Sequence, residues 1–179
     1  MLIKSQIQGE NISLRNLAEE DVPIMTQWIN DPGVSRYLQV ELPVTEEYER
    51  AWVQDINASQ NDQVFGIIEK STNTYIGNVG IHDIKKESGV ATVGIFIGNK
   101  SKQGKGYGRE AIELVTDFAF DQLRIQKLQA PIFLFNQRSI AIFEKAGFLR
   151  EAAFLEKHIK NGEHQDTVLL VRINTHLPA

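Results

Sequence analysis

The sequence predicts an α/β fold of the α+β kind, in which helices flank a mixed β-sheet. Residues 64–97 are rich in β-branched and aromatic side chains and are divided by short turn-forming stretches, which is typical of an antiparallel meander. Before and after this region, apolar residues recur at spacings of three and four, which is typical of amphipathic helices. Helices in line with the strands of one sheet define this fold class.

The first third of the chain is predicted to be mainly helical. A short strand at 12–15 precedes a helix at 19–29, which has acids in its first turn, where the helix dipole favours them, and ends at Asp31-Pro32-Gly33. A second helix is expected from Thr45, its N-cap, to 57. Its side chains at spacings of four form one face: Tyr48, Trp52 and Ile56.

The meander is predicted to consist of three strands. They lie at 64–69, 74–83 and 90–97, and the turns between them are Ser71-Thr72-Asn73 and Lys86-Glu87-Ser88-Gly89.

Two more amphipathic helices follow the meander. The first spans 109–123, and Gly147, a natural C′ residue, ends the second, at 138–146. Six apolar residues of the first helix are expected to be buried: Ala111, Leu114, Val115, Phe118, Ala119 and Phe120. Five polar ones are expected to be exposed: Glu110, Glu113, Thr116, Asp117 and Asp121.

Three strands are predicted to complete the sheet. The strand at 127–135 contains Pro131, which has no N–H to donate, so pairing on one side should break there. Strands at 154–159 and 167–173 are expected to form a hairpin around Asn161-Gly162.

Composition limits the range of functions. The 179 residues, 42% hydrophobic and 23% charged, are predicted to form one domain, residues 1–179. Nineteen Lys and Arg against 23 Asp and Glu give a net charge of −4, so nucleic acid is not expected as a partner. No apolar run approaches the ~18 residues that span a bilayer, and residues 1–6 lack the apolar core of a signal peptide. We expect a cytoplasmic protein with no membrane partner.

Metal chemistry is not expected either. The absence of cysteine excludes disulfides, thiolate metal sites and a cysteine nucleophile. No two of the four histidines form an HxxxH pair; they are His82, His158, His164 and His176.

A glycine-rich loop lies between an apolar strand and an amphipathic helix. In Gln103-Gly104-Lys105-Gly106-Tyr107-Gly108, backbone N–H groups and the helix N-terminus would point out of one end of the sheet, an arrangement that binds anions. Neighbouring cations are Lys100, Lys102, Lys105 and Arg109. Asn99 and Gly106 exclude a Walker loop, and Arg109 excludes a dinucleotide GxGxxG motif. A pyrophosphate fits this loop; the alternative is a flexible surface loop.

Two motifs, in order and at the right separation, carry a family resemblance. Gln103-x-x-Gly106-x-Gly108 resembles the acetyl-CoA signature Q/R-x-x-G-x-G/A of the GNAT N-acetyltransferases. The segment from Asn136 to Phe148, NQRSIAIFEKAGF, is similar to the N-x-x-S/A…EKxGF segment of that family. Tyr75-Ile76-Gly77-Asn78-Val79-Gly80 and Gly162…Asp166 resemble the branch that contains ribosomal-protein serine and alanine α-amino acetyltransferases. The likeness covers nearly the whole chain.

The resemblance implies a GNAT fold, with a central mixed, mostly antiparallel sheet splayed between its fourth and fifth strands, and acetyl-CoA as co-substrate. The backbone of Phe96, Ile97 and Gly98 would pair with the pantetheine, and residues 103–108 would hold the pyrophosphate. Asn136 would bind the pantetheine arm, with Arg138 on a CoA phosphate and Ser139 beside them; Asn136 also suits a plain N-cap.

The acid that protonates the departing thiolate is not the usual one of the family. Many members have Tyr where this chain has Phe143, which cannot donate a proton. Ser139, which the ribosomal-protein branch shares, is the candidate acid, and its alternative role is in the first turn of a helix. Tyr107 is a second candidate.

The identity of the base that takes the proton from the amine is also left open. Relatives often carry Glu at the start of the cofactor strand, where this chain has Thr92, which would not deprotonate an amine. His82 and Asp83, or Glu87 in the next turn, are candidates acting through water, and a site without a dedicated base is the alternative.

The acceptor is expected to be a primary amine. Residues 1–60 hold four Lys and Arg against ten Asp and Glu, a balance of −6, and the resemblance places their two helices at the acceptor side. These acids either attract a cationic amine or form a solvated face. Four acceptors stay open: a protein or peptide α-amine, a polyamine, an aminosugar and a small-molecule amine. The rival function is a degenerate GNAT module that binds acyl-CoA as a sensor or interaction partner, and a homodimer is compatible with the edge strand and C-terminal hairpin.

Overall fold

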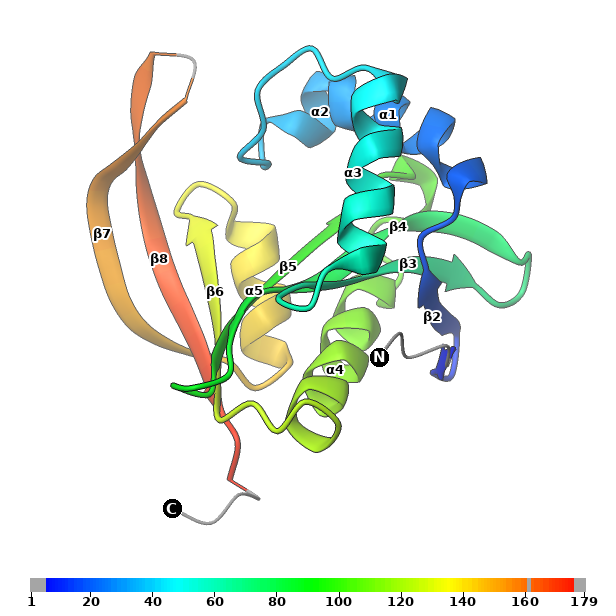
Figure 1. Ribbon diagram of the computed structural model, residues 1–179. Helices are drawn as coiled ribbons and strands as arrows, with labels where there is room; N and C mark the ends of the chain where they lie inside the picture. The colour runs from blue at the N-terminus through cyan, green and yellow to red at the C-terminus, as the bar shows by residue number, and fades with distance from the viewer. Residues whose placement is uncertain (1–5, 161, 176–179) are drawn as a thin grey trace.

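The computed structural model describes residues 6–160 and 162–175, and within them one eight-stranded sheet has the order β1-β2-β3-β4-β5-β6-β8-β7 (Figure 1). Every neighbouring pair is antiparallel except β5 and β6. The strands are β1 Ile7–Gln8, β2 Ile12–Asn16, β3 Gln63–Glu69, β4 Thr74–Lys85, β5 Val90–Ile97, β6 Lys127–Phe133, β7 Leu149–Lys160 and β8 Glu163–Ile173. The helices are η1 Glu19–Asp21, α1 Val22–Asn30, α2 Pro32–Ser35, α3 Glu46–Ala58, η2 Lys100–Lys102, α4 Tyr107–Asp121 and α5 Gln137–Lys145. The predicted α+β class and mixed, mostly antiparallel sheet are confirmed.

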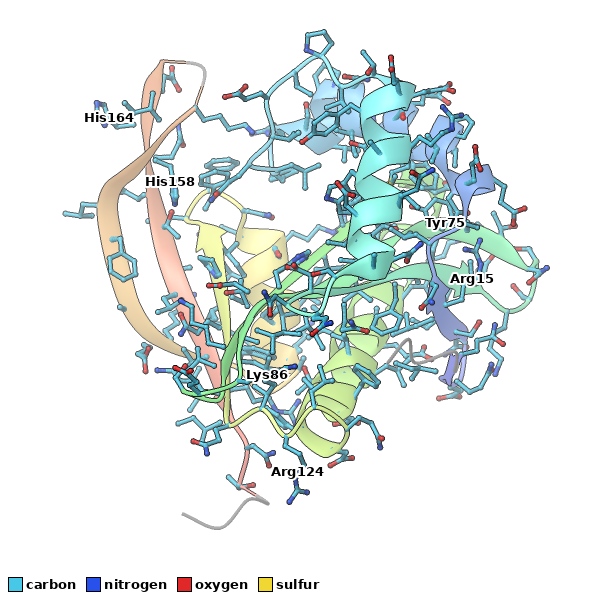
Figure 2. All side chains as sticks on the ribbon, in the orientation of Figure 1. Arg15, Tyr75, Lys86, Arg124, His158 and His164 are labelled. Carbon is cyan, nitrogen blue, oxygen red and sulfur yellow. The ribbon has the colours of Figure 1, made fainter. Side chains whose placement is uncertain are left out.

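Two apolar clusters occupy the two faces of this sheet, where side chains fill the space between the ribbons (Figure 2). The larger one joins α4 and α5 to the strands through fully buried side chains such as Val115, Ile140 and Phe65. The second joins α1 and α3 to β3 through Met25 and Val53. Among the described residues, no helix is long and apolar enough to cross a membrane.

The predicted helix at 19–29 is divided in the structure. Glu19–Asp21 form a 3₁₀ turn, and α1 starts at Val22 with Pro23 in its first turn. Proline is tolerated there because the first N–H groups of a helix have no intrahelical acceptor. The helix ends at Asn30, but Asp31 caps a further turn, α2, by accepting from the N–H of Gly33 (2.7 Å), and this helix was not predicted.

Helix α3 confirms Thr45 as N-cap and differs from the prediction at Tyr48. The N–H of Tyr48 donates to Thr45 Oγ1 (3.2 Å). The Tyr48 side chain, predicted to share one face with Trp52 and Ile56, is 60% exposed, whereas Glu49 is buried beside Val53. The helix packs on both α1 and β3, so its buried face is wider than a single row at spacings of four.

Helix α4 begins two residues before its predicted start and buries one residue predicted to be exposed. Thr116 has no exposed surface, and its hydroxyl has no hydrogen-bond partner within the described part of the chain. The helix packs on both the sheet and the neighbouring α5, so more than one stripe of side chains is covered.

The C-terminal half follows the prediction with longer strands. Gly147, with φ of +85°, follows α5 as predicted. Strands β7 and β8 extend past their predicted limits, so that Lys160 pairs with Glu163. Gly162 has φ of +79°, as a tight turn requires, and Asn161 lies outside the described residues.

Candidate active site

The sheet opens between β5 and β6. Their parallel pairing covers Val90–Thr92 against Lys127–Gln129, and β5 then continues to Ile97 without a strand partner on that side among the described residues. Strand β6 stays with β8 through Pro131 to Phe133, so pairing breaks near Pro131 on one side only, as predicted. The two-residue β1 aside, β5 and β6 are the fourth and fifth strands, and Figure 1 shows them diverging.

The unpaired edge of β5 presents alternate backbone groups to this opening. The N–H of Gly98 donates to Ile76 O (3.0 Å), so Gly98 and, two residues before it, Phe96 direct their backbone groups toward β4. Ile97, with Ile95 and Val93, directs its groups toward the splay. Of the three residues expected to pair with pantetheine, Ile97 therefore has the matching orientation.

Packing also explains why residue 98 is a glycine. A Cβ at this position would lie 2.2 Å from the indole of Trp28 on α1, because the ring packs directly on the backbone. The missing side chain of Gly98 therefore makes room for Trp28.

The glycine loop joins η2 to α4 through two left-handed residues. Gly104 has φ of +77°, and Gly106, the N-cap of α4, has φ of +89°. A Cβ on Gly106 would meet no atom within 4 Å, so the space above this helix N-terminus is open. A Cβ on Gly108 would lie at ordinary van der Waals distance, 3.8–3.9 Å, from Ile95, Ile97 and Ile142, so this position faces β5 and α5.

Gln103 brings three of the predicted residues together. Its Nε2 donates to Ile97 O (2.8 Å), and its Oε1 accepts from an Nη atom of Arg138 (2.8 Å). The end of β5, the glycine loop and the first turn of α5 are thereby connected at the mouth of the splay.

The predicted positive charge around the loop is partly neutralised. Lys100 pairs with Asp31 (2.6 Å) and Arg109 with Glu113 (2.8 Å), both at exposed positions where such pairs are weak. Lys102 pairs with buried Glu69. Lys105 is exposed, with no ion pair among the described residues, and stays available to an anion together with Arg138.

Glu69 anchors the loop from β3 and was not identified from the sequence. It is 3% exposed and accepts from Lys102, from Thr72 and from the hydroxyl of Tyr107 (2.6 Å). These donors hold the pKa of Glu69 at about 2, and the bond to Glu69 raises the pKa of Tyr107. The Tyr107 hydroxyl is thus committed to Glu69, which removes it as the second candidate acid.

Asn136 and Ser139 lie at the start of α5. Asn136 is its N-cap, with Oδ1 accepting from the N–H of Ser139 (3.2 Å). The cap uses only the backbone of Ser139, so its half-buried hydroxyl keeps no partner among the described residues. Phe143 is 2% exposed and packs edge-on against Phe148 (5.0 Å), so it belongs to the core.

The two candidate bases lie in different places. His82 on β4 is directly opposite Thr92, the last β5 residue that pairs with β6. Glu87 is exposed in the β4–β5 turn, at the closed end of the opening. The structure therefore brings His82, and not Glu87, to the apex of the splay.

These features fit a CoA thioester. The unpaired β5 edge can pair with an extended amide chain, and the open space above Gly106 would be filled by any Cβ. A pyrophosphate at that point would meet a helix N-terminus, with Lys105 and Arg138 as the neighbouring cations.

Comparison with known proteins agrees with this geometry. The profile described as "Acetyltransferase (GNAT) domain" matches residues 11–149. The chain is 31% identical over 150 residues to the N-acetyltransferase p20 of Bacillus licheniformis, covering 79% of this chain and 84% of that protein. The chain belongs to the GNAT acetyltransferase family. It is an acetyl-CoA-dependent acyltransferase.

Two solved structures share its fold. The spermidine N-acetyltransferase of Vibrio cholerae in complex with CoA and spermine has a TM-score of 0.86 at 21% identity, covering 93% of this chain and 98% of that one. The ribosomal-protein-S5-alanine acetyltransferase of Vibrio fischeri has a TM-score of 0.85 at 18% identity, covering 98% of this chain and 100% of that one. The predicted GNAT fold is confirmed.

Proposed function

We propose that this protein transfers the acetyl group of acetyl-CoA to a primary amine by direct attack of the amine nitrogen. The observation that carries the proposal is the unpaired edge of β5, which begins after Thr92 and leads through η2 to the open glycine loop. A strand edge of this kind binds an extended amide chain, and the loop provides the anion site at its end.

The binding residues have separate tasks in this proposal. Val93, Ile95 and Ile97 pair through their backbone with the pantetheine amides, and residues 103–108 hold the pyrophosphate. Gln103 fixes Arg138 beside the loop through its 2.8 Å contact, and Arg138 contacts a CoA phosphate. Asn136, besides capping α5, binds the pantetheine arm.

The transfer requires two proton movements. The amine loses a proton to His82, its nitrogen bonds to the acetyl carbon, and the bond from that carbon to sulfur breaks. The Ser139 hydroxyl donates its proton to the departing sulfur, and water replaces that proton on the hydroxyl. An ammonium has no lone pair for attack, so a base that is neutral near pH 7 is needed, and burial lowers the pKa of His82 in that direction.

The acceptor in this proposal carries a cationic amine. The neighbours named above act on spermidine and on a ribosomal-protein alanine, respectively. The exposed Glu46 and Glu47 of α3 add negative charge to the α1–α3 side of the sheet. A polyamine and a peptide N-terminus are therefore the acceptors to test first, before neutral ones.

The test measures CoA release with a polyamine, an N-terminal peptide and an aminosugar, together with the shift in Tm caused by acetyl-CoA. A ligand at a hundredfold excess over Kd stabilises the native state by about 2.7 kcal/mol. Gly106→Val should abolish both signals, because the branched side chain fills the open space and disfavours φ of +89°.

Gly162→Val is the matched control. Gly162 also has a positive φ, +79°, and open surroundings, but it lies in the β7–β8 turn, so its variant should keep both signals. A normal acetyl-CoA shift in folded Gly106→Val would contradict the phosphate site. Acetyl-CoA binding by the native protein without CoA release for any amine would favour the non-catalytic binding module.

A further inference from the structure

Asp62, in the turn between α3 and β3, faces the imidazole of His82. The Asp62 Oδ1 lies 3.5 Å from His82 Nδ1, and both side chains are partly exposed, at 29% and 38%. The carboxylate is itself held in place: Oδ2 accepts from the Ser59 hydroxyl (2.9 Å) and Oδ1 from the N–H of Asp83 (3.2 Å). A carboxylate that is held in place therefore faces one specific nitrogen of the ring, Nδ1.

The other ring nitrogen faces the sheet beyond the apex of the splay. Gly80 on β4 and Gly94 on β5 are register partners, and Cβ atoms there would lie 2.7 Å and 3.7 Å from His82 Nε2. The ring thus lies over a surface that two glycines leave bare. Gly94 is two residues past Thr92, the last β5 residue paired with β6, so Nε2 lies over the part of β5 whose outer edge is unpaired.

The surroundings of the ring determine its tautomer. An Nδ1–H directed at the Asp62 carboxylate leaves the lone pair on Nε2, which is the nitrogen above the glycine surface. Thr92, opposite on β5, is uncharged, and Asp83 pairs with Lys85 (3.1 Å). Burial lowers the pKa of His82, and Asp62 partly offsets that effect.

We propose that Asp62 is a positioning residue for His82, fixing the imidazole so that its Nε2 takes the proton from the acceptor amine. This inference rests on the proposed function. In the proton transfer, an N–H bond of the ammonium breaks and its proton goes to Nε2 of His82. The freed lone pair then forms the bond to the acetyl carbon. Asp62 keeps its negative charge throughout and stabilises the imidazolium that forms.

The first test follows kcat/KM against pH for Asp62→Asn. Loss of the carboxylate charge should lower the pKa of His82, so the acid limb of the profile should move to lower pH. The plateau should fall at least ~10-fold, with KM for acetyl-CoA unchanged, because the asparagine amide can hold the wrong tautomer. His82→Gln should remove the acid limb and lower kcat by ~10²-fold or more.

Asp121→Asn is the matched control. It removes the same charge at an exposed position at the end of α4, which has no role in the proposed chemistry. Its pH profile should match that of the native protein. An acid limb that stays in place in Asp62→Asn, or full activity in His82→Gln, would overturn the proposal.

A second measurement does not depend on turnover. Nitrogen-15 NMR of the histidine side chains, with His82 assigned from His82→Gln, should show Nδ1 protonated and Nε2 bare above the pKa. Asp62→Asn should lower that pKa, and Asp121→Asn should leave it in place. A His82 with its proton on Nε2, or a pKa that is the same in Asp62→Asn, would overturn the positioning role even if no acceptor amine is found.

Discussion

The Glu49 carboxylate is buried, and within the described part of the chain one of its two oxygens has no hydrogen-bond partner. The residue is 4% exposed in the first turn of α3, and its Oε2 has no partner among the described residues. Its neighbours include the apolar cluster around Val53, so burial raises the pKa of its carboxyl. This acid is therefore not part of the solvated surface to which its exposed neighbours belong.

Glu49→Leu should stabilise the protein, and the gain should depend on pH. A carboxyl whose pKa is raised on folding lowers stability as pH rises through the interval between its unfolded and folded pKa values. The substitution removes this loss, so unfolding at pH 8 should cost about 1–3 kcal/mol more than in the native protein. The gain should shrink toward pH 4. Denaturation curves at both pH values measure it.

Glu46→Leu is the control for Glu49→Leu. Glu46 lies in the same helical turn but is exposed, so its replacement should leave stability within ~0.5 kcal/mol at either pH. A Glu49→Leu variant that is less stable than the native protein at pH 8 would show that the carboxylate is satisfied in solution.

Ser139→Ala should lower kcat by ~10²-fold or more without changing acetyl-CoA affinity beyond a few-fold. The N-cap bond of α5 uses the Ser139 N–H, which alanine keeps, so helix stability should be nearly unaffected. Steady-state kinetics and the acetyl-CoA shift in Tm separate the two effects. Ser139→Thr, which keeps a hydroxyl, should recover part of the rate. Normal turnover by Ser139→Ala would leave proton donation to water.

At the scale of elements, α3 has two chemically different faces. Its buried face packs on α1 and β3, and its exposed face carries Glu46 and Glu47. The acidic residues of 1–60 therefore do not form one surface, because Glu49 is buried whereas its sequence neighbours are exposed. Only the exposed face can attract a cation through solvent.

Reversing Glu46 or Glu47 to Lys should raise KM for a cationic amine several-fold at low salt, because the field at the α3 face changes sign. The defect should shrink between about 20 and 300 mM salt, which bracket the ~10 Å Debye length of 0.1 M. Asp121→Lys, the same charge change at the end of α4, is the control and should leave KM unchanged. A KM indifferent to both charge and salt would favour a neutral acceptor.

The edges of the sheet bear on assembly. Strand β7 is the outermost strand on the β8 side and exposes Leu149, Leu155 and Ile159. An exposed apolar edge strand favours association. The homodimer inferred from the sequence stays a prediction at this edge.

At the scale of the whole molecule, the site exists because two layers of helices fix a sheet that does not close. One cluster joins α4 and α5 to the strands, and the other joins α1 and α3 to them. Strand β5 belongs to the meander, and β6 pairs with β8 of the C-terminal hairpin, so their separation beyond Thr92 places the unpaired edge of β5 between two parts of the sheet. Gln103 and Arg138 connect the two parts at the open end.

Local chemistry allowed most elements to be predicted from the sequence. Thr45 caps a helix through its own side chain, and Gly147 and Pro131 act through their own backbone, so their effects do not depend on distant contacts. The glycine loop was found in the same way, since its motif is contiguous. Helix α2 was missed because a four-residue turn has too little periodicity to be recognised.

The sequence by itself determined the fold class, the family and the position of the glycine loop that we propose as the anion site, because each depends on residues close together in the chain. Only the tertiary structure decided which polar side chains meet. Asp62 reaches His82 across 20 positions, and Glu69 reaches Tyr107 across 38. Burial of Glu49 likewise depends on how α3 packs against α1 and β3. Contacts between separate elements leave no local pattern, because register and packing, and not spacing along the chain, bring such groups together.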